Sequence, residues 1–161
     1  MGSARAAELA AALETVNLEL IQLVRGCSDE QWATLANDEG DGRSVGVIAH
    51  HVAHGHLDTI EWLETALEGR PIEITLAIQD ELNARHAETY HDVERDVTAA
   101  LLEDYGRRLI ERIERLDDEE LARTGYHVGA GRAMTVEAFA NLGARHVTGH
   151  MATIKKALDL D

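Results

Sequence analysis

The chain has 161 residues, of which 15 are basic and 30 acidic, so its net charge is −15 at pH 7. A charge of this sign disfavours contact with a phosphate backbone or an anionic membrane surface. The sequence also lacks an apolar run of roughly 18 residues, the length that suggests a membrane span. We therefore expect neither a nucleic-acid partner nor a membrane partner. With 45% hydrophobic and 28% charged residues, residues 1–161 are predicted to form one globular domain.

The number of cysteines indicates whether the protein is found in a reducing or an oxidising compartment. Cys27 is the only cysteine and cannot form an intramolecular disulfide, which is typical of proteins in a reducing environment. The first residues do not show the basic segment and apolar stretch of a secretory signal. We therefore predict a cytoplasmic protein.

The first half of the sequence predicts two long helices. Apolar residues recur at spacings of three and four over residues 4–26, which indicates an amphipathic helix. A short helix is expected from Ser28, where Ser-Asp-Glu-Gln has the form of a capping box. A polar, glycine-bearing loop is predicted over residues 37–42. Ser44 then resembles the cap of a second long helix that reaches about Glu68.

The second half predicts two more long helices. One is expected over residues 76–116, with Gly106 marking a bend or a break. Its predicted inner side consists of Leu82, Thr89, Val93, Val97, Ala100, Leu109, Ile113 and Leu116. A flexible loop is expected over residues 125–134, and Thr135 is predicted to cap a last helix that ends near Leu158. No convincing strand pattern is seen. The fold predicted is all-α, an antiparallel four-helix bundle with a long connection between its second and third helices.

Histidines are the most informative residues. The chain has nine, and four of them fall at positions 50, 51, 54 and 56. His146 and His150 lie four apart in the last predicted helix, so their side chains point the same way, with Cβ atoms about 5–6 Å apart. Two imidazoles at this spacing can bind one metal ion, with a third ligand supplied by the second helix. The alternatives are surface histidines or hydrogen-bonded core histidines.

Three glycines in the predicted helices lie near these histidines, and their destabilising effect on a helix requires an explanation. Gly55, Gly143 and Gly149 each cost a helix about 1 kcal/mol relative to alanine. Close approach of another helix or access for a ligand would explain that cost. Tight packing of the bundle without a ligand is the alternative.

Three motifs give the chain a resemblance to the DinB-like superfamily. Residues 44–53 read Ser-Val-Gly-Val-Ile-Ala-His-His-Val-Ala, residues 146–154 read His-Val-Thr-Gly-His-Met-Ala-Thr-Ile, and residues 80–85 read Asp-Glu-Leu-Asn-Ala-Arg. The resemblance implies a four-helix bundle in which three histidines bind one divalent ion. Carried onto this sequence, the metal ligands are His51, His146 and His150. His50 and His54 compete with His51 by proximity.

The same resemblance implies a function. Members of the family include S-transferases and isomerases that use low-molecular-weight thiols such as bacillithiol, mycothiol or glutathione. The leading hypothesis is therefore a metal-dependent thiol S-transferase that acts on a small molecule, in detoxification or stress response. Nickel or zinc is the expected ion, with iron, manganese or copper as alternatives.

Two other functions remain open. A metal-dependent hydrolase would need a general base, for which Asp58 and Glu137 are candidates. A homodimeric stress or binding protein would use the metal only for structure, with His127 as a conceivable fourth ligand. Trp62 and Phe139 could serve packing or a dimer interface, and His86, Tyr90 and His91 could line a pocket or be exposed. No basic pocket for a thiol cofactor can be identified in the sequence beyond the scattered Arg43, Arg132 and Arg145.

Overall fold

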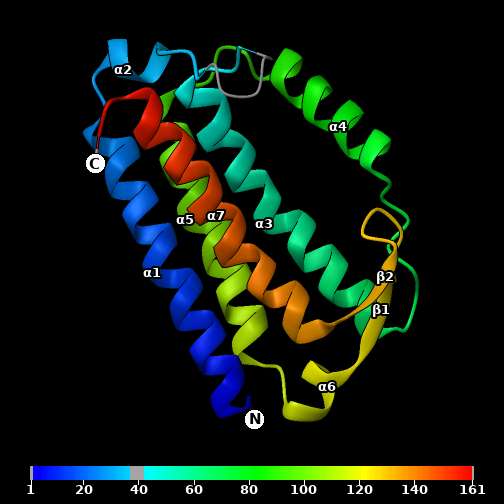
Figure 1. The fold of residues 1–161 in the computed structure, drawn as a ribbon. Coiled ribbons are helices and arrows are strands. Elements are labelled where there is room, and N and C mark those ends of the chain that lie inside the picture. Colours follow the sequence, from blue (N-terminus) through cyan, green and yellow to red (C-terminus); the bar gives the residue numbers. More distant parts are fainter. Residues whose placement is uncertain (1, 37–41, 161) are drawn as a thin grey trace.

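The fold is known from a computed structural model that describes residues 2–36 and 42–160 (Figure 1). The elements in chain order are α1 (Ala4–Gly26), α2 (Asp29–Ala33), α3 (Val45–Leu67), α4 (Leu76–Thr89), α5 (Arg95–Glu114), α6 (Asp118–Ala122), β1 (Thr124–His127), β2 (Arg132–Thr135) and α7 (Val136–Ala157). Most of the predicted loop 37–42 lies outside the described residues. The predicted caps are confirmed, because the side chains of Ser28, Ser44 and Thr135 each accept a hydrogen bond from the first turn of their helix.

The four long helices α1, α3, α5 and α7 form a four-helix bundle, as predicted (Figure 1). Both α1 and α3 pack against α5 and α7, so α1 and α3 occupy opposite corners. The backbone of Ser3 bonds to that of Leu116, which places the start of α1 beside the end of α5. Arg112 pairs with Glu64, which places the late part of α5 beside the late part of α3. The neighbours α1 and α5 are thus antiparallel, whereas α3 and α5 run the same way.

The predicted long connection between α3 and α5 contains a helix of its own. After α3 the chain turns at Gly69 and runs back along the outside of the bundle as α4 (Figure 1). No residue of α4 is buried. Because α4 returns the chain to the end where α3 began, α5 can start beside the start of α3.

The single helix predicted over residues 76–116 is wrong. The helical hydrogen bonding stops at Thr89 and resumes at Arg95. The segment between them is held by other parts of the fold: the Trp32 Nε1–H group donates to the carbonyl of Val93 at 2.8 Å, and Arg95 donates to the carbonyl of Cys27. The sequence has neither glycine nor proline in this segment, so it carries no local signal of the break.

The break also shifts the buried face of the helix. Leu82 and Val97 were predicted to face inward, but they are 46% and 52% exposed. Thr98 and Leu102 are fully buried in their place. Restarting the helix resets its angular phase, so the apolar spacing cannot be carried across the gap. Farther along α5, the predicted inner residues Leu109, Ile113 and Leu116 are buried.

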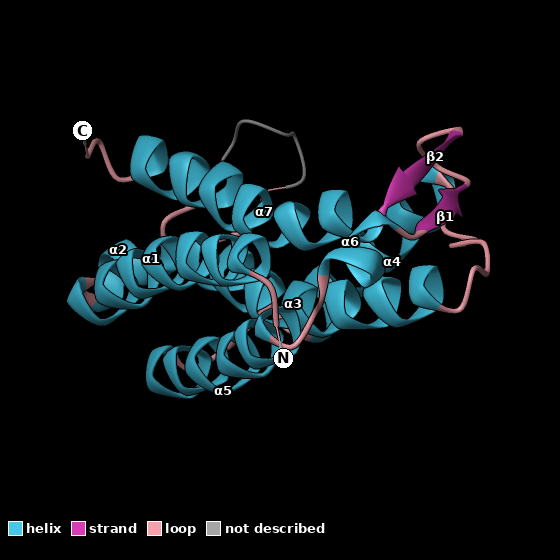
Figure 2. Ribbon diagram, turned by 90° about the horizontal axis from the view of Figure 1, so that it is seen from below, coloured by secondary structure: helices cyan, strands magenta, loops and turns pink. Residues whose placement is uncertain are grey.

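The predicted loop 125–134 is largely a β-hairpin, and α6 precedes it (Figure 2). The strands are antiparallel, with Thr124 opposite Thr135 and His127 opposite Arg132. The turn uses Gly131, whose φ of +64° suits glycine. The backbone of Ile72 bonds to Tyr126 and Val128, which anchors the hairpin beside the end of α3. This tertiary support explains why the strands are not visible in the sequence pattern.

A hydrogen-bonded polar group lies within the aliphatic core. The Asn17 amide on α1 donates through Nδ2 to the carbonyl of Leu102 at 3.0 Å, and its Oδ1 accepts from His56 Nε2 at 3.0 Å. A Cβ at Gly106 would lie 2.2 Å from Asn17 Nδ2. Gly106 therefore provides space for this amide beside α5, and the helix continues through it without a break. Of the helices that the structure describes, none has the length and apolar character that crossing a membrane requires.

Candidate metal centre

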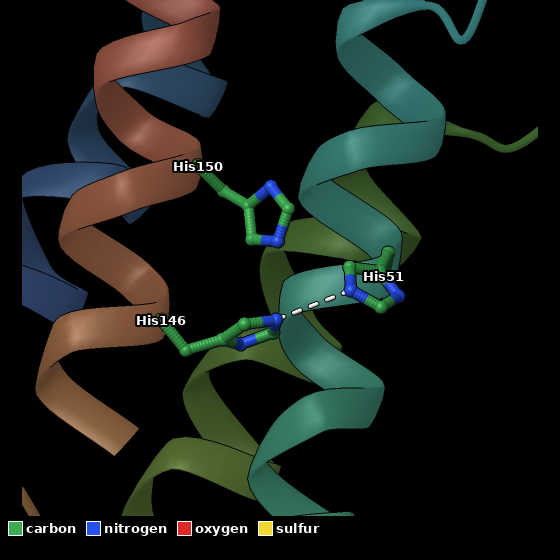
Figure 3. Close-up of side chains that lie close together, drawn as sticks. All are labelled: His51, His146 and His150. Carbon is green, nitrogen blue, oxygen red and sulfur yellow. Dashed lines mark hydrogen bonds between the residues drawn. The ribbon is translucent and has the colours of Figure 1, made fainter. Parts of the chain in front are cut away.

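The three histidines predicted as metal ligands converge on one point between two helices. His51 extends from α3, and His146 and His150 extend from α7, toward one another (Figure 3). One ring nitrogen of each lies within 4.8 Å of those of the other two. His51 and His146 are separated by 95 positions in the sequence, and the packing of α3 on α7 brings them together.

The separation of two of these nitrogens fits a shared metal ion. The Nε2 atoms of His51 and His146 lie 3.1 Å apart and share a hydrogen bond (Figure 3). Two metal–nitrogen bonds of about 2.0–2.1 Å at angles between a right angle and the tetrahedral angle hold their nitrogens about 2.9–3.4 Å apart. The ring of His150 lies 5.0 Å from that of His51 and 4.6 Å from that of His146, measured between centroids. The donor set therefore fits a divalent ion.

Burial keeps the imidazoles of His51 and His146 neutral. Burial, together with the neighbouring His146 and His150, lowers the pKa of His51 to about 2. It also lowers the pKa of His146 to about 3. A neutral imidazole is the form that binds a metal, so at pH 7 these rings need not lose an acidic proton first.

The three glycines differ in their roles. A Cβ at Gly55 would lie 2.5 Å from Cε1 of His146, so Gly55 makes space for this ring. A Cβ at Gly143 would lie 3.1 Å from Leu109, which indicates bundle packing. Nothing lies within 4 Å of a Cβ at Gly149. The expectation of close approach holds for Gly55 and Gly143, and the described structure gives no packing reason for Gly149.

A cavity of about 940 Å³, here called the α3–α7 pocket, adjoins the histidines. Its walls come from α3, α4, residues 70–74, the hairpin and α7, and its lining includes His51, Asp58, Trp62, His127, Arg145 and His146. The walls desolvate the Asp58 carboxyl and raise its pKa, and the nearby Glu61 raises it further. The other predicted base, Glu137, pairs instead with Arg5 at 2.7 Å and does not line this pocket.

His127 does not join the three histidines. It lines the pocket from β1, where its Nδ1 accepts from the backbone N–H of Ala130 at 3.1 Å. Its ring lies against those of Trp62 and Phe139. Phe139 is fully buried in the core, so of the two roles considered for it, packing is the one the structure supports. Trp62 lines the pocket.

The neighbouring histidines form a separate group, here called the α3–α4 cluster, which consists of His50, His54, His86 and Tyr90. His50 Nδ1 and His86 Nε2 share a hydrogen bond of 2.9 Å. His50 and His54 therefore face α4, and neither replaces His51 at the convergence point. His86, for which a place in a pocket wall was considered, does not line the α3–α7 pocket, and its ring lies 5.5 Å from that of His51. The sequence signal that could have revealed this cluster is the spacing of four residues within two pairs, His50 with His54 and His86 with Tyr90. His91 instead bonds to the carbonyl of Glu88 on the exposed surface.

Comparisons with known proteins agree with this architecture. The sequence pattern of the DinB superfamily matches residues 5–154. The chain belongs to the DinB superfamily. This confirms the resemblance drawn from the three motifs, and the match spans all four helices of the bundle.

One solved DinB-like structure resembles this chain over its full length. It is described as "YfiT from Bacillus subtilis is a probable metal-dependent hydrolase with an unusual four-helix bundle topology". The two share 21% sequence identity with a TM-score of 0.80, and the alignment covers 100% of this chain and 91% of that one. At this identity the likeness shows the fold. No curated protein matches the chain.

Proposed function

We propose that this DinB-superfamily protein is an enzyme that depends on one divalent metal ion, held by His51, His146 and His150. The observation that carries the proposal is the convergence of three histidine nitrogens at a cavity of about 940 Å³. Three protein ligands leave coordination positions open, as in catalytic sites, and a bound ion supplies a Lewis acid there. Nickel or zinc is the proposed ion, with iron, manganese or copper as alternatives.

Hydrolysis of a small molecule is the reaction that the pocket supports best. Asp58 follows His51 by seven residues on α3, which places it about 10 Å farther along the helix, and both line the pocket. At that distance Asp58 meets the substrate or a water molecule beside it, and does not reach the metal ligands. Its raised pKa brings the carboxylate closer to the range in which a general base works well near pH 7. The hydrolase description of the similar structure supports the same reaction class.

Thiol S-transfer is the second candidate. Cys27 is the only thiol of the chain; it is buried, bonds to the carbonyl of Leu23 and does not line the pocket. The thiol would therefore be a co-substrate. A volume of about 940 Å³ lies at the upper end of ordinary ligand pockets, so it has room for a tripeptide-sized thiol and an electrophile. A purely structural metal is less favoured, because among the described residues no fourth histidine, cysteine or carboxylate joins the three.

Metal analysis tests the proposal directly. Protein purified without an affinity tag is expected to contain about one metal ion per chain, and His51→Ala and His150→Ala are each expected to lose it. His91→Ala, which removes an exposed histidine away from the site, is the matched control and should keep the ion. Wild-type protein that takes up neither nickel nor zinc would overturn the ligand assignment.

Activity assays then separate the two reactions. Metal-loaded protein is compared with chelator-treated protein on a panel of aryl esters and amides, and on transfer of glutathione or bacillithiol to an aryl chloride. Hydrolysis that needs the metal and falls in Asp58→Asn supports the first candidate. Thiol transfer without hydrolysis supports the second.

A further inference from the structure

Two arginines of the α3–α7 pocket stand apart from the other arginines of the chain. Elsewhere in the described residues, arginine side chains pair with carboxylates or have another polar partner. Within residues 2–36 and 42–160, Arg132 and Arg145 have no such partner. Both line the same pocket, Arg132 from β2 and Arg145 from α7.

This placement is unusual for so acidic a protein. At a net charge of −15, carboxylates outnumber basic groups, and a guanidinium readily finds one on the surface. Arg132 and Arg145 extend from separate elements, line one cavity and have no carboxylate partner among the described residues. Their guanidinium groups therefore leave a local positive charge in the pocket that His51 and His146 also line. Arg145 and His146 line the same pocket, so an anion bound by the guanidinium shares that cavity with the proposed metal site.

The rest of the pocket lining indicates the other part of the ligand. Apolar walls are provided by Trp62, Ile72, Met134 and Leu142. Asp58 and Glu61 line the α3 side and Glu73 lines the segment that follows α3, and these carboxylates repel an anionic group there. A ligand with an apolar body and one anionic end therefore fits in a single orientation, with its anion toward β2 and α7.

We propose that the α3–α7 pocket binds a small carboxylic acid with an apolar body, whose carboxylate is held by Arg132 and Arg145. A guanidinium donates two parallel hydrogen bonds to a carboxylate, which gives orientation as well as affinity. This inference rests on the proposed function in one respect, since it names the substrate class for the same pocket.

Calorimetric titration of chelator-treated, metal-free protein tests the inference. The probes are naphthalene-2-carboxylate and its uncharged amide, which have nearly the same shape. The carboxylate is expected to bind at least tenfold more tightly than the amide. The double variant Arg132→Gln and Arg145→Gln should lower the carboxylate affinity to that of the amide. Arg85→Gln is the matched control, because Arg85 lies on α4 in a salt bridge with Glu81 and outside the pocket lining.

The inference would be overturned by equal affinity for carboxylate and amide or by no binding of the carboxylate. It would also be overturned by a preference that survives in the double variant while the thermal unfolding of that variant is unchanged. Tighter binding of 2-naphthyl phosphate than of the carboxylate would also overturn it, in favour of a phosphate ligand. Because the titration uses metal-free protein, its result is independent of metal binding. Carboxylate binding by a protein that never takes up zinc would support this inference and contradict the proposed function.

Discussion

At the scale of single residues, glycines decide how closely side chains approach the candidate metal centre. Gly55 lies against the His146 ring, and a Cβ there would be 2.5 Å from Cε1. A side chain at position 55 would force the His146 ring to move, and this would displace a proposed metal ligand. Gly149 lies one residue before His150 on the exposed side of α7, with nothing within 4 Å of its missing Cβ.

Alanine substitution of these two glycines should therefore have opposite effects. Gly55→Ala is expected to lower the affinity for zinc at least tenfold, measured by competition with a chromophoric chelator. Gly149→Ala should leave that affinity unchanged and raise the free energy of unfolding by roughly 0.5–1 kcal/mol, because alanine favours a helix over glycine. Equal zinc affinity in the two variants would show that His146 is not held in place by Gly55.

At the scale of elements, the break between α4 and α5 depends on contacts from distant parts of the chain. The Trp32 ring of α2 lies against Gly46, where a Cβ would be 2.7 Å from the ring, and its Nε1–H group donates to Val93. These contacts hold the segment that the helical pattern would otherwise continue through. They also fix where α4 ends, and thus where His86 and Tyr90 meet α3.

Removing the indole donor should loosen this junction. Trp32→Phe is expected to lower the free energy of unfolding by about 1–3 kcal/mol, through a lost hydrogen bond and a smaller buried ring. Amide hydrogen exchange should speed up at the start of α5. Trp62→Phe is the matched control and should cost less, since Trp62 is half-buried like Trp32 but lines the pocket and does not contact the segment between α4 and α5. Unchanged exchange in Trp32→Phe would mean that α5 starts at Arg95 for local reasons.

At the scale of the whole molecule, buried neutral histidines link stability to pH. Burial lowers the pKa of His50, His56 and His86 to about 4 each, whereas an unfolded histidine titrates near 6.5. Between these values the unfolded chain binds more protons than the folded one. Stability is therefore full above about pH 6.5 and falls as the pH drops toward 4.

Urea unfolding of metal-free protein checks this effect. The free energy of unfolding is expected to fall between pH 7 and pH 5 by about 1–2 kcal/mol for each strongly shifted histidine. His56→Gln should flatten the slope, because His56 is almost fully buried and bonded to Asn17. His91→Gln should leave the slope as it is. A pH-independent stability in the wild type would contradict the burial argument.

Other whole-molecule properties stay predictions. A homodimer is expected, and light scattering with size-exclusion chromatography would measure the oligomeric state. The cytoplasmic location expected from the lone Cys27 stays a prediction as well.

What the sequence determined by itself is local or periodic. The helical spacing of apolar residues and the caps at Ser28, Ser44 and Thr135 are encoded within a few residues, so the bundle helices α1, α3 and α7 could be predicted from the sequence closely. The spacing of four between His146 and His150 is a property of one helix. Assigning His51 as their partner needed the family motif, and its role as a ligand still awaits metal analysis.

Only the tertiary structure determined the remaining features, because these features depend on contacts between residues far apart in the chain. The segment between α4 and α5 is held at Val93 by Trp32, and the hairpin is held by the backbone of Ile72. The grouping of His50 with His86, and the gathering of Asp58, Arg132 and Arg145 around one cavity, follow from how α3, α4, the hairpin and α7 pack. Periodicity shows which face of a helix is apolar, but not which other element covers it.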